Sequence, residues 1–148
     1  MTLEKQIETD LTQAMKNKDM DRLNTLRMVK SAVTNSKIAK KTETLQDSDL
    51  IDILQKQVKQ RMESYESFEK AGRKELAAKE KKEMEILSTY LPKQLDDAAI
   101  KAEIQKAIVK AGITSRNDIG RLMKEVMPGL KGKADGKKIN EIALSLLN

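Results

Sequence analysis

The chain has 148 residues, of which 39% are hydrophobic and 35% are charged, and its net charge is +6. Only two Tyr, one Phe and no Trp are present, and this scarcity of aromatic side chains argues against a β-sandwich or barrel. Leu, Ile, Ala, Met, Lys, Glu and Gln dominate, and most of these favour helix. We therefore expect an all-α protein, long enough for one domain or two small ones.

Two residue types are missing altogether. Without Cys, the chain has no disulfide, thiolate metal site or cysteine nucleophile, and without His it lacks the commonest general base and metal ligand. No apolar run approaches the ~20 residues of a membrane span, and acidic residues near the N-terminus argue against a signal peptide. We expect a cytoplasmic protein with no membrane association, no metal and no cofactor.

The first half of the sequence is typical of long helices. Apolar residues recur every three or four positions, which predicts helices over about 3–17 and 20–40. A third helix is expected to begin after a cap at Asp47 or Ser48 and to end near Gly72. Its apolar seam is predicted to comprise Ile51, Leu54, Val58, Tyr65 and Phe68, with Arg61 at a position where the pattern favours an apolar side chain.

A fourth helix, over about 73–89, is unusually rich in charge. Its apolar stripe is thin, and its acidic and basic residues are spaced for pairing four positions apart. We expect this helix to project or lie on the surface, with Glu83 and Glu85 on a solvated face. The predicted apolar stripe consists of Leu76, Met84 and Leu87.

The pattern changes at "YLPKQLD", residues 90–96, where Pro92 disfavours helical geometry for Leu91. We place a domain boundary here, between an N-terminal helical domain of residues 1–90 and a C-terminal three-helix domain of residues 91–148. The C-terminal helices are delimited by polar caps and by Gly or Pro. The expected caps are Asp96, Ser115 with Asp118, and Asp135, and the expected stops are Gly112 and Pro128 with Gly129.

The stretch "KGKADGKKIN", residues 131–140, holds four lysines and two glycines. It does not have the glycine spacing of a P-loop, because Lys137 stands where the second glycine would be. As plain structure, it is a turn in which Gly132 relaxes the backbone and Asp135 caps the last helix.

The lysines of this stretch favour a second interpretation. Lys137 and Lys138 lie in the first turn of the last helix, where the helix dipole disfavours cations. A helix N-terminus surrounded by lysines suits a phosphate group. We therefore prefer the hypothesis that Lys131, Lys133, Lys137 and Lys138 contact a nucleic-acid backbone over the hypothesis of a solvated turn.

Another basic cluster lies in the helix over 20–40. Residues 16–41 carry eight basic and two acidic side chains. This cluster has two possible interpretations. It could bind nucleic acid, or it could be a solvated stripe whose aliphatic stems cover apolar surface, and we favour the second interpretation. The stripe consists of Arg27, Lys30, Lys37 and Lys41.

No arrangement typical of catalysis is present in the sequence. The carboxylates lie on charged helices, and the serines lack a glycine-rich elbow and any histidine. Asp118 is better explained as a capping residue than as an acid catalyst. We expect no enzymatic activity from the chain alone.

Three stretches together resemble the YqeY-like family. They are "LRMVKSAV" at 26–33, "YLPKQL" at 90–95 and "DIGRLMKEVMPGLKGKADGKKINEIALSLL" at 118–147, and the last is the most specific. That family is similar to the C-terminal helical region of the B subunit of tRNA-dependent amidotransferase (GatB). The resemblance implies an all-helical, two-part protein whose residues 91–148 correspond to a tail region that contacts tRNA in that enzyme.

The residues and the resemblance lead to one preferred function and two alternatives. The preferred function is non-catalytic binding of RNA, most simply tRNA or another structured RNA. The first alternative is an accessory component of a glutamine-dependent carbon–nitrogen ligase, active only with other amidotransferase subunits. The second is a protein-interaction adaptor that uses the helices of residues 47–89. The expected RNA contacts are Lys131, Lys133, Lys137 and Lys138, supported by Arg121 and Lys124.

Overall fold

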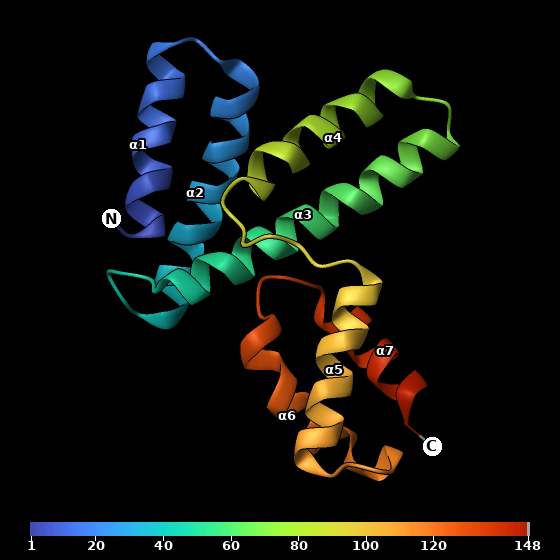
Figure 1. Ribbon diagram of the computed structural model, residues 1–148. Helices are drawn as coiled ribbons and strands as arrows, with labels where there is room; N and C mark the ends of the chain where they lie inside the picture. The colour runs from blue at the N-terminus through green and yellow to red at the C-terminus, as the bar shows by residue number, and fades with distance from the viewer. Residues whose placement is uncertain (148) are drawn as a thin grey trace. The chain divides into compact units, whose positions relative to one another are not determined.

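A computed structural model describes residues 1–147 of the chain (Figure 1). Within that range the protein consists of seven α-helices and one short 3₁₀ helix, without a β-strand, which confirms the all-α prediction. The helices are α1 (Leu3–Lys16), α2 (Met20–Lys40), α3 (Asp47–Lys70), α4 (Lys74–Ser88), α5 (Asp97–Ala111), the 3₁₀ helix (Arg116–Asp118), α6 (Ile119–Leu130) and α7 (Gly136–Leu146).

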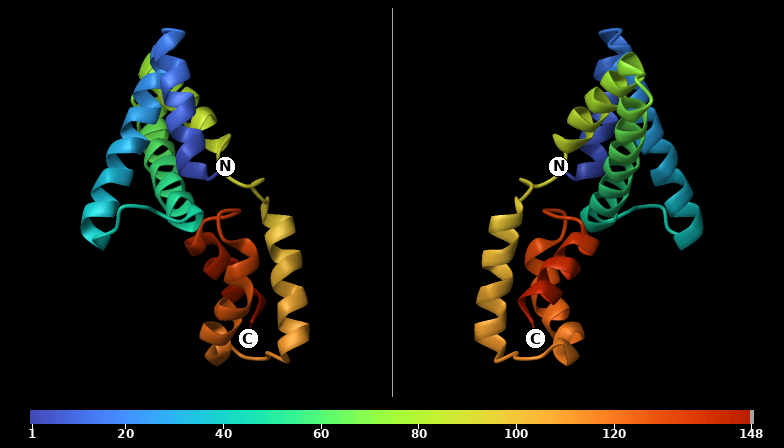
Figure 2. Two further views of the ribbon diagram at one scale, coloured as in Figure 1. Left: turned by 90° about the vertical axis from the view of Figure 1, so that its left-hand side faces the viewer. Right: turned by 90° about the vertical axis from the view of Figure 1, so that its right-hand side faces the viewer.

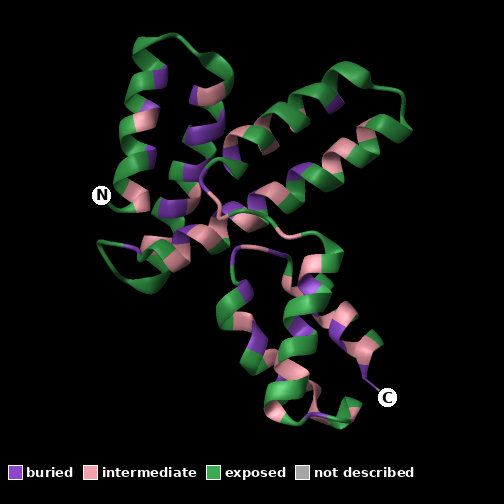
Figure 3. Ribbon diagram, viewed as in Figure 1, coloured by how far each residue is buried: buried purple, intermediate pink, exposed green. Residues whose placement is uncertain are grey.

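The chain divides into two compact units between Leu91 and Pro92. The first unit contains α1 to α4, and the second contains α5 to α7. Each unit has a hydrophobic core of its own. Figure 3 shows buried positions alternating with exposed ones along the helices, as expected for amphipathic helices that bury one face.

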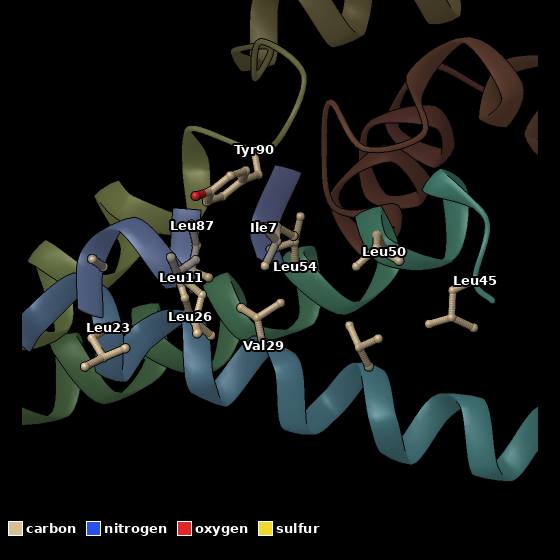
Figure 4. Close-up of a cluster of buried hydrophobic side chains, with 12 residues drawn as sticks. Ile7, Leu11, Leu23, Leu26, Val29, Leu45, Leu50, Leu54, Leu87 and Tyr90 are labelled. Carbon is tan, nitrogen blue, oxygen red and sulfur yellow. The ribbon is translucent and has the colours of Figure 1, made fainter. Parts of the chain in front are cut away.

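The core of the first unit lies where its four helices meet (Figure 4). Leu26 of α2, Leu50 and Leu54 of α3 and Leu87 of α4 are fully buried. The helix α1 adds Ile7 and Leu11, and the loop before α3 adds Leu45. The start of α3 is also held by α1, because the backbone N–H of Leu3 donates to Asp47 Oδ1 at 3.0 Å.

The beginning of α3 differs from the prediction. Gln46 is its N-cap residue, in place of Asp47 or Ser48. The backbone N–H of Gln46 donates to Asp49 Oδ2 at 3.1 Å, so Asp49 supplies the reciprocal half of a capping box. Asp47 is engaged by α1 instead, and this partner, 44 residues away, leaves no local signal in the sequence.

Helices α3 and α4 pack against each other as a hairpin, which the views in Figures 1 and 2 show from three sides. Gly72 closes the connection with a positive φ of 71°. The buried stripe of α4 differs from the prediction, since Ala77 is fully buried whereas Leu76 is 40% exposed. The helix α4 lies on the surface, as one of the two predicted alternatives has it, but its acidic face is not wholly solvated, because part of that face meets α3.

Helices α3 and α4 are joined by a buried ion pair on the acidic face of α4. Arg61 of α3 is only 4% exposed, and its Nε donates to Glu83 Oε2 of α4 at 2.9 Å. A second guanidinium nitrogen donates to the Gln57 carbonyl at 3.2 Å. Arg61 therefore occupies an apolar position of the α3 pattern because Glu83 compensates its charge, and Glu83 is not on a solvated face.

The second unit packs α5, α6 and α7 around Ile100, Ile104, Leu122 and Ile139, which are fully buried. The ends of α5 follow the sequence prediction. Asp96 Oδ1 accepts the N–H of Ala99 at 2.8 Å, and Gly112 ends the helix in the left-handed region, with φ of 65°. Figure 2 shows the three helices of this unit from opposite sides.

Two boundaries of α6 were wrongly predicted. Ser115 caps the 3₁₀ helix, where its Oγ accepts the Asn117 N–H at 3.1 Å, and the Asp118 side chain does not cap α6. At the other end, α6 continues through Pro128 to Leu130. Leu130 is 2% exposed, and its burial stabilises the last turn of the helix. This stabilisation offsets the backbone hydrogen bond that Pro128 cannot donate.

Candidate nucleic-acid interface

The segment from Lys131 to Lys138, here called the basic turn, connects α6 to α7. Along its first half, buried and more exposed residues alternate: Gly132 and Ala134 are buried, whereas Lys131 is exposed and Lys133 is intermediate. This alternation follows from anchoring every second residue in the unit. It directs the lysines toward the surface.

The basic turn is anchored by the segment that precedes α5. The Leu95 N–H donates to the Lys133 carbonyl at 2.9 Å. The Gln94 side-chain amide donates to the Gly132 carbonyl at 2.6 Å and to the Pro92 carbonyl at 2.9 Å. Gly132 itself has φ of 80°, a left-handed conformation rather than a relaxed extended one. The "YLPKQL" motif therefore anchors the lysine-rich motif through its backbone.

The end of the basic turn is the N-terminus of α7. Asp135 has extended backbone geometry, and its carboxylate accepts the Lys137 N–H at 3.4 Å, which confirms Asp135 as the cap. Lys137 and Lys138 are both exposed in the first turn. The positive end of the helix dipole and these two ammonium groups thus coincide at one edge of the unit.

The N-terminus of α5 lies beside that of α7. Lys138 Nζ forms a salt bridge with Asp97 Oδ1 at 2.6 Å, between side chains that are 49% and 69% exposed. The hydrogen bond to Asp97 and the charge of that carboxylate raise the pKa of Lys138. Lys138 is therefore a protonated side chain that is already oriented by an exposed acid, and solvent screens the pair.

Arg121 lies away from the basic turn. Its guanidinium donates to the carbonyl of Ala111, at the C-terminal end of α5, whereas the basic turn is tied to Leu95 at the N-terminal end. The 15 residues of α5 span about 22 Å. Lys124 is exposed one turn further along α6. The four lysines thus share the basic turn, whereas Arg121 is bonded at the opposite end of α5.

Sequence reasoning missed two residues of this site, Gln94 and Asp97. Gln94 lies inside the "YLPKQL" motif, so its position was marked, but its bonding partner is 38 residues away. Asp97 directly follows the predicted cap Asp96. Nothing in the local sequence indicates that it meets Lys138.

The basic stripe of α2 is partly neutralised within the first unit. Lys37 forms a salt bridge with Glu4 of α1, and the neighbouring Lys40 pairs with Asp49 Oδ1 at 2.6 Å. Arg27, Lys30 and Lys41 are exposed. The stripe therefore presents fewer uncompensated charges than its sequence suggests.

Two further findings on the described residues concern metal binding and membrane-spanning helices. In residues 1–147, Asp and Glu side chains nowhere gather in a group of three or more that could hold a metal ion. None of the helices between residues 1 and 147 has the length and apolar character needed to cross a membrane.

Comparison with known proteins gives matches over nearly the whole chain. The family model described as "Yqey-like protein" matches residues 4–147. A Pyrenophora tritici-repentis protein, named altered inheritance of mitochondria protein 41, mitochondrial, is 32% identical over 145 residues, which cover 92% of this chain and 78% of that protein. A Saccharomyces cerevisiae protein of the same name is 30% identical over 133 residues, covering 90% of this chain and 63% of its own length.

These relatives correct one expectation. We expected a cytoplasmic protein from the lack of Cys and of a signal peptide, and the mitochondrial names of the relatives contradict that location. Composition was a poor guide here, because a chain without Cys suits any reducing compartment. The match of the family model to residues 4–147, together with relatives at 30% identity or more, shows that the chain belongs to the YqeY-like family.

Proposed function

We propose that the protein is a non-catalytic RNA-binding module whose contact surface is the basic turn. The observation that supports this most is the anchoring of the turn by Gln94 and Leu95, which directs its lysines outward beside the N-terminus of α7. Phosphate groups are the ligands that such an arrangement suits best. A solvated turn gives no reason for two lysines at a helix end that disfavours cations.

Charge and resemblance support the same proposal. Residues 91–148 contain 11 basic and 7 acidic side chains, a net charge of +4. Their resemblance to the tail region of the amidotransferase B subunit makes tRNA the first RNA to test. The salt bridge between Lys138 and Asp97 is exposed, so a phosphate group can replace the carboxylate at low cost.

The test is filter binding of tRNA by the full chain across a salt series. Each phosphate contact releases condensed counterions, so affinity should fall with a slope of about −0.7 to −0.9 per phosphate neutralised. Changing Lys131, Lys133, Lys137 and Lys138 to Gln should weaken binding and flatten this slope by about two to four. A control that changes Lys5, Lys16, Lys56 and Lys70 to Gln removes the same charge from exposed positions of the first unit.

The control should retain the slope of the natural protein. Equal slopes for the natural protein and the basic-turn variant would contradict the proposal, as would an equal loss in both variants. Asp97→Asn provides a change in the opposite direction, because it releases Lys138 from its carboxylate. That variant should bind tRNA more tightly than the natural protein at low salt.

A further inference from the structure

The outer face of α4 carries four exposed residues at intervals of three, four and three: Ala78, Lys81, Glu85 and Ser88. At about 100° per residue, they fall on one stripe of the helix. Leu87, which points into the core of the first unit, is on another face. One side of this stripe borders α3, because Lys81, Glu85 and Ser88 line the same pocket as Val58 and Met62.

An apolar groove borders the stripe. It has a volume of about 540 Å³ and is lined by Val58 and Met62 of α3 and by Met84 of α4. Lys81 and Glu85 also line it. Met62 is 46% exposed, so the groove presents a flexible and polarizable side chain to solvent.

The neighbouring charges of α4 are held in salt bridges, whereas in residues 1–147 the only engagement of the stripe is the charge of Glu85, which adds to the hydrogen bond and charge of Asp21 in raising the pKa of Lys82. Lys82 Nζ pairs with Asp21 Oδ2 of α2 at 2.8 Å, and Glu83 pairs with Arg61. Among the described residues, Lys81 and Glu85 form no salt bridge. Their charges are therefore available to a group outside the unit.

The stripe is complementary to itself. Lys81 and Glu85 lie equally far on either side of position 83, and so do the two small residues, Ala78 and Ser88. When two copies of α4 meet antiparallel about a two-fold axis at that position, each Lys81 faces the Glu85 of the other copy. The small residues face each other at both ends, where they permit close approach.

We propose that this face binds a second copy of the chain, so that the protein forms a two-fold symmetric dimer through α4 and the groove beside it. The groove supplies apolar area at the centre, and the two Lys81–Glu85 pairs fix the antiparallel orientation. A partner with another sequence would need charges in the same order as Lys81 and Glu85, and small residues at the positions of Ala78 and Ser88. This inference does not depend on RNA binding, since it concerns the first unit and is tested without RNA.

The experiment is sedimentation equilibrium of the full chain over a concentration series. The mass should rise from 16.7 kDa toward twice that value as concentration increases. Glu85→Lys places two lysines opposite each other and should weaken the dimer by about tenfold or more. Lys81→Glu should do the same by opposing two carboxylates.

The charge-swapped double variant, Lys81→Glu with Glu85→Lys, restores opposite charges and should regain dimerisation. Glu43→Lys, an exposed loop position, is the matched control and should behave as the natural protein. Circular dichroism confirms that each variant keeps its helices. The mass of a single chain up to about 1 mM would overturn the proposal, and so would a dimer that Glu85→Lys leaves intact or that the double variant fails to restore.

Discussion

At the scale of single residues, Tyr90 connects three helices at the end of the first unit. Its hydroxyl donates to Asp10 Oδ2 of α1 at 2.6 Å and accepts from Arg22 Nη2 of α2 at 3.2 Å. Tyr90 is 8% exposed and belongs to the core of this unit (Figure 4). The first residue of the "YLPKQL" motif thus fixes the end of α4 against α1 and α2.

Burial, followed by the hydrogen bond to Asp10, raises the pKa of Tyr90 from 10.0 to about 12. Because the folded protein holds this proton more tightly than the unfolded chain, the resulting stability is complete below pH 10 and is lost as pH rises toward 12. Tyr90→Phe should cost about 1 kcal/mol at neutral pH. It should also remove the late step of tyrosine ionisation in an ultraviolet absorbance titration. A late step that persists in this variant would contradict the assignment.

The pair of Arg61 and Glu83 gives a second prediction at this scale. Arg61→Met leaves a buried carboxylate without its cation and should lower the free energy of unfolding by about 3–5 kcal/mol. Replacing both residues, with Arg61→Met and Glu83→Leu, should cost less than the single change. Urea denaturation of the three proteins measures this difference, and a double variant less stable than Arg61→Met would contradict it.

Because Glu80 lies near this ion pair, the loss of stability in Arg61→Met should depend on pH. Burial and then the charge of Glu83 raise its pKa, while Arg61 opposes them. Without Arg61, the pKa of Glu80 should rise further. A raised carboxyl pKa means stability that is present at low pH and lost as pH rises through the folded-state pKa. The deficit of Arg61→Met should therefore shrink when denaturation is repeated at acidic pH.

At the scale of elements, the helices begin and end where local chemistry and tertiary contacts agree. Asp96, Asp135 and Gly112 act as the sequence predicts, because a cap or a left-handed glycine needs only its immediate neighbours. The end of α6 shows the opposite case, since burial of Leu130 extends the helix beyond Pro128. The basic turn combines both, with a left-handed Gly132 held by a distant Gln94.

Two glycines near the end of α6 should respond in opposite directions to the same substitution. Gly132→Ala places a Cβ at φ of 80° and should destabilise the protein by about 1–2 kcal/mol. Gly129 lies within α6, where an added Cβ would meet nothing within 4 Å. Gly129→Ala should therefore stabilise the protein by about 0.5–1 kcal/mol. Thermal melting followed by circular dichroism compares the two. Similar melting temperatures for both variants would refute the left-handed geometry of the turn.

At the scale of the whole molecule, the division at Leu91 and Pro92 separates two cores. No residue of one core belongs to the other. The boundary follows from Pro92 and from the Tyr90 contacts that end the first unit. Independent folding of the two parts is a prediction drawn from this separation.

A fragment of residues 91–148 should therefore be helical and melt cooperatively on its own. Its core includes ten buried residues contributed by all three helices and their connections. A chain of about 60 residues is near the lower limit for independent folding, so we expect a modest melting temperature. Circular dichroism tests this, and a spectrum of coil would show that the second unit requires the first.

The helices, the caps Asp96 and Asp135 and the family could be predicted from the amino-acid sequence, because these depend on neighbouring residues or on the order of motifs. Which charges are buried, paired or exposed depends on contacts between helices that are distant in the sequence. Glu83 and Glu85 lie two residues apart in the sequence, yet one neutralises Arg61 in the interior and the other is exposed. Likewise Arg121, close in sequence to the basic turn, bonds to the C-terminal end of α5, whereas the basic turn is tied to the segment before α5. The environment of a charged side chain depends on partners that are distant along the chain, and helical periodicity carries no information about those partners.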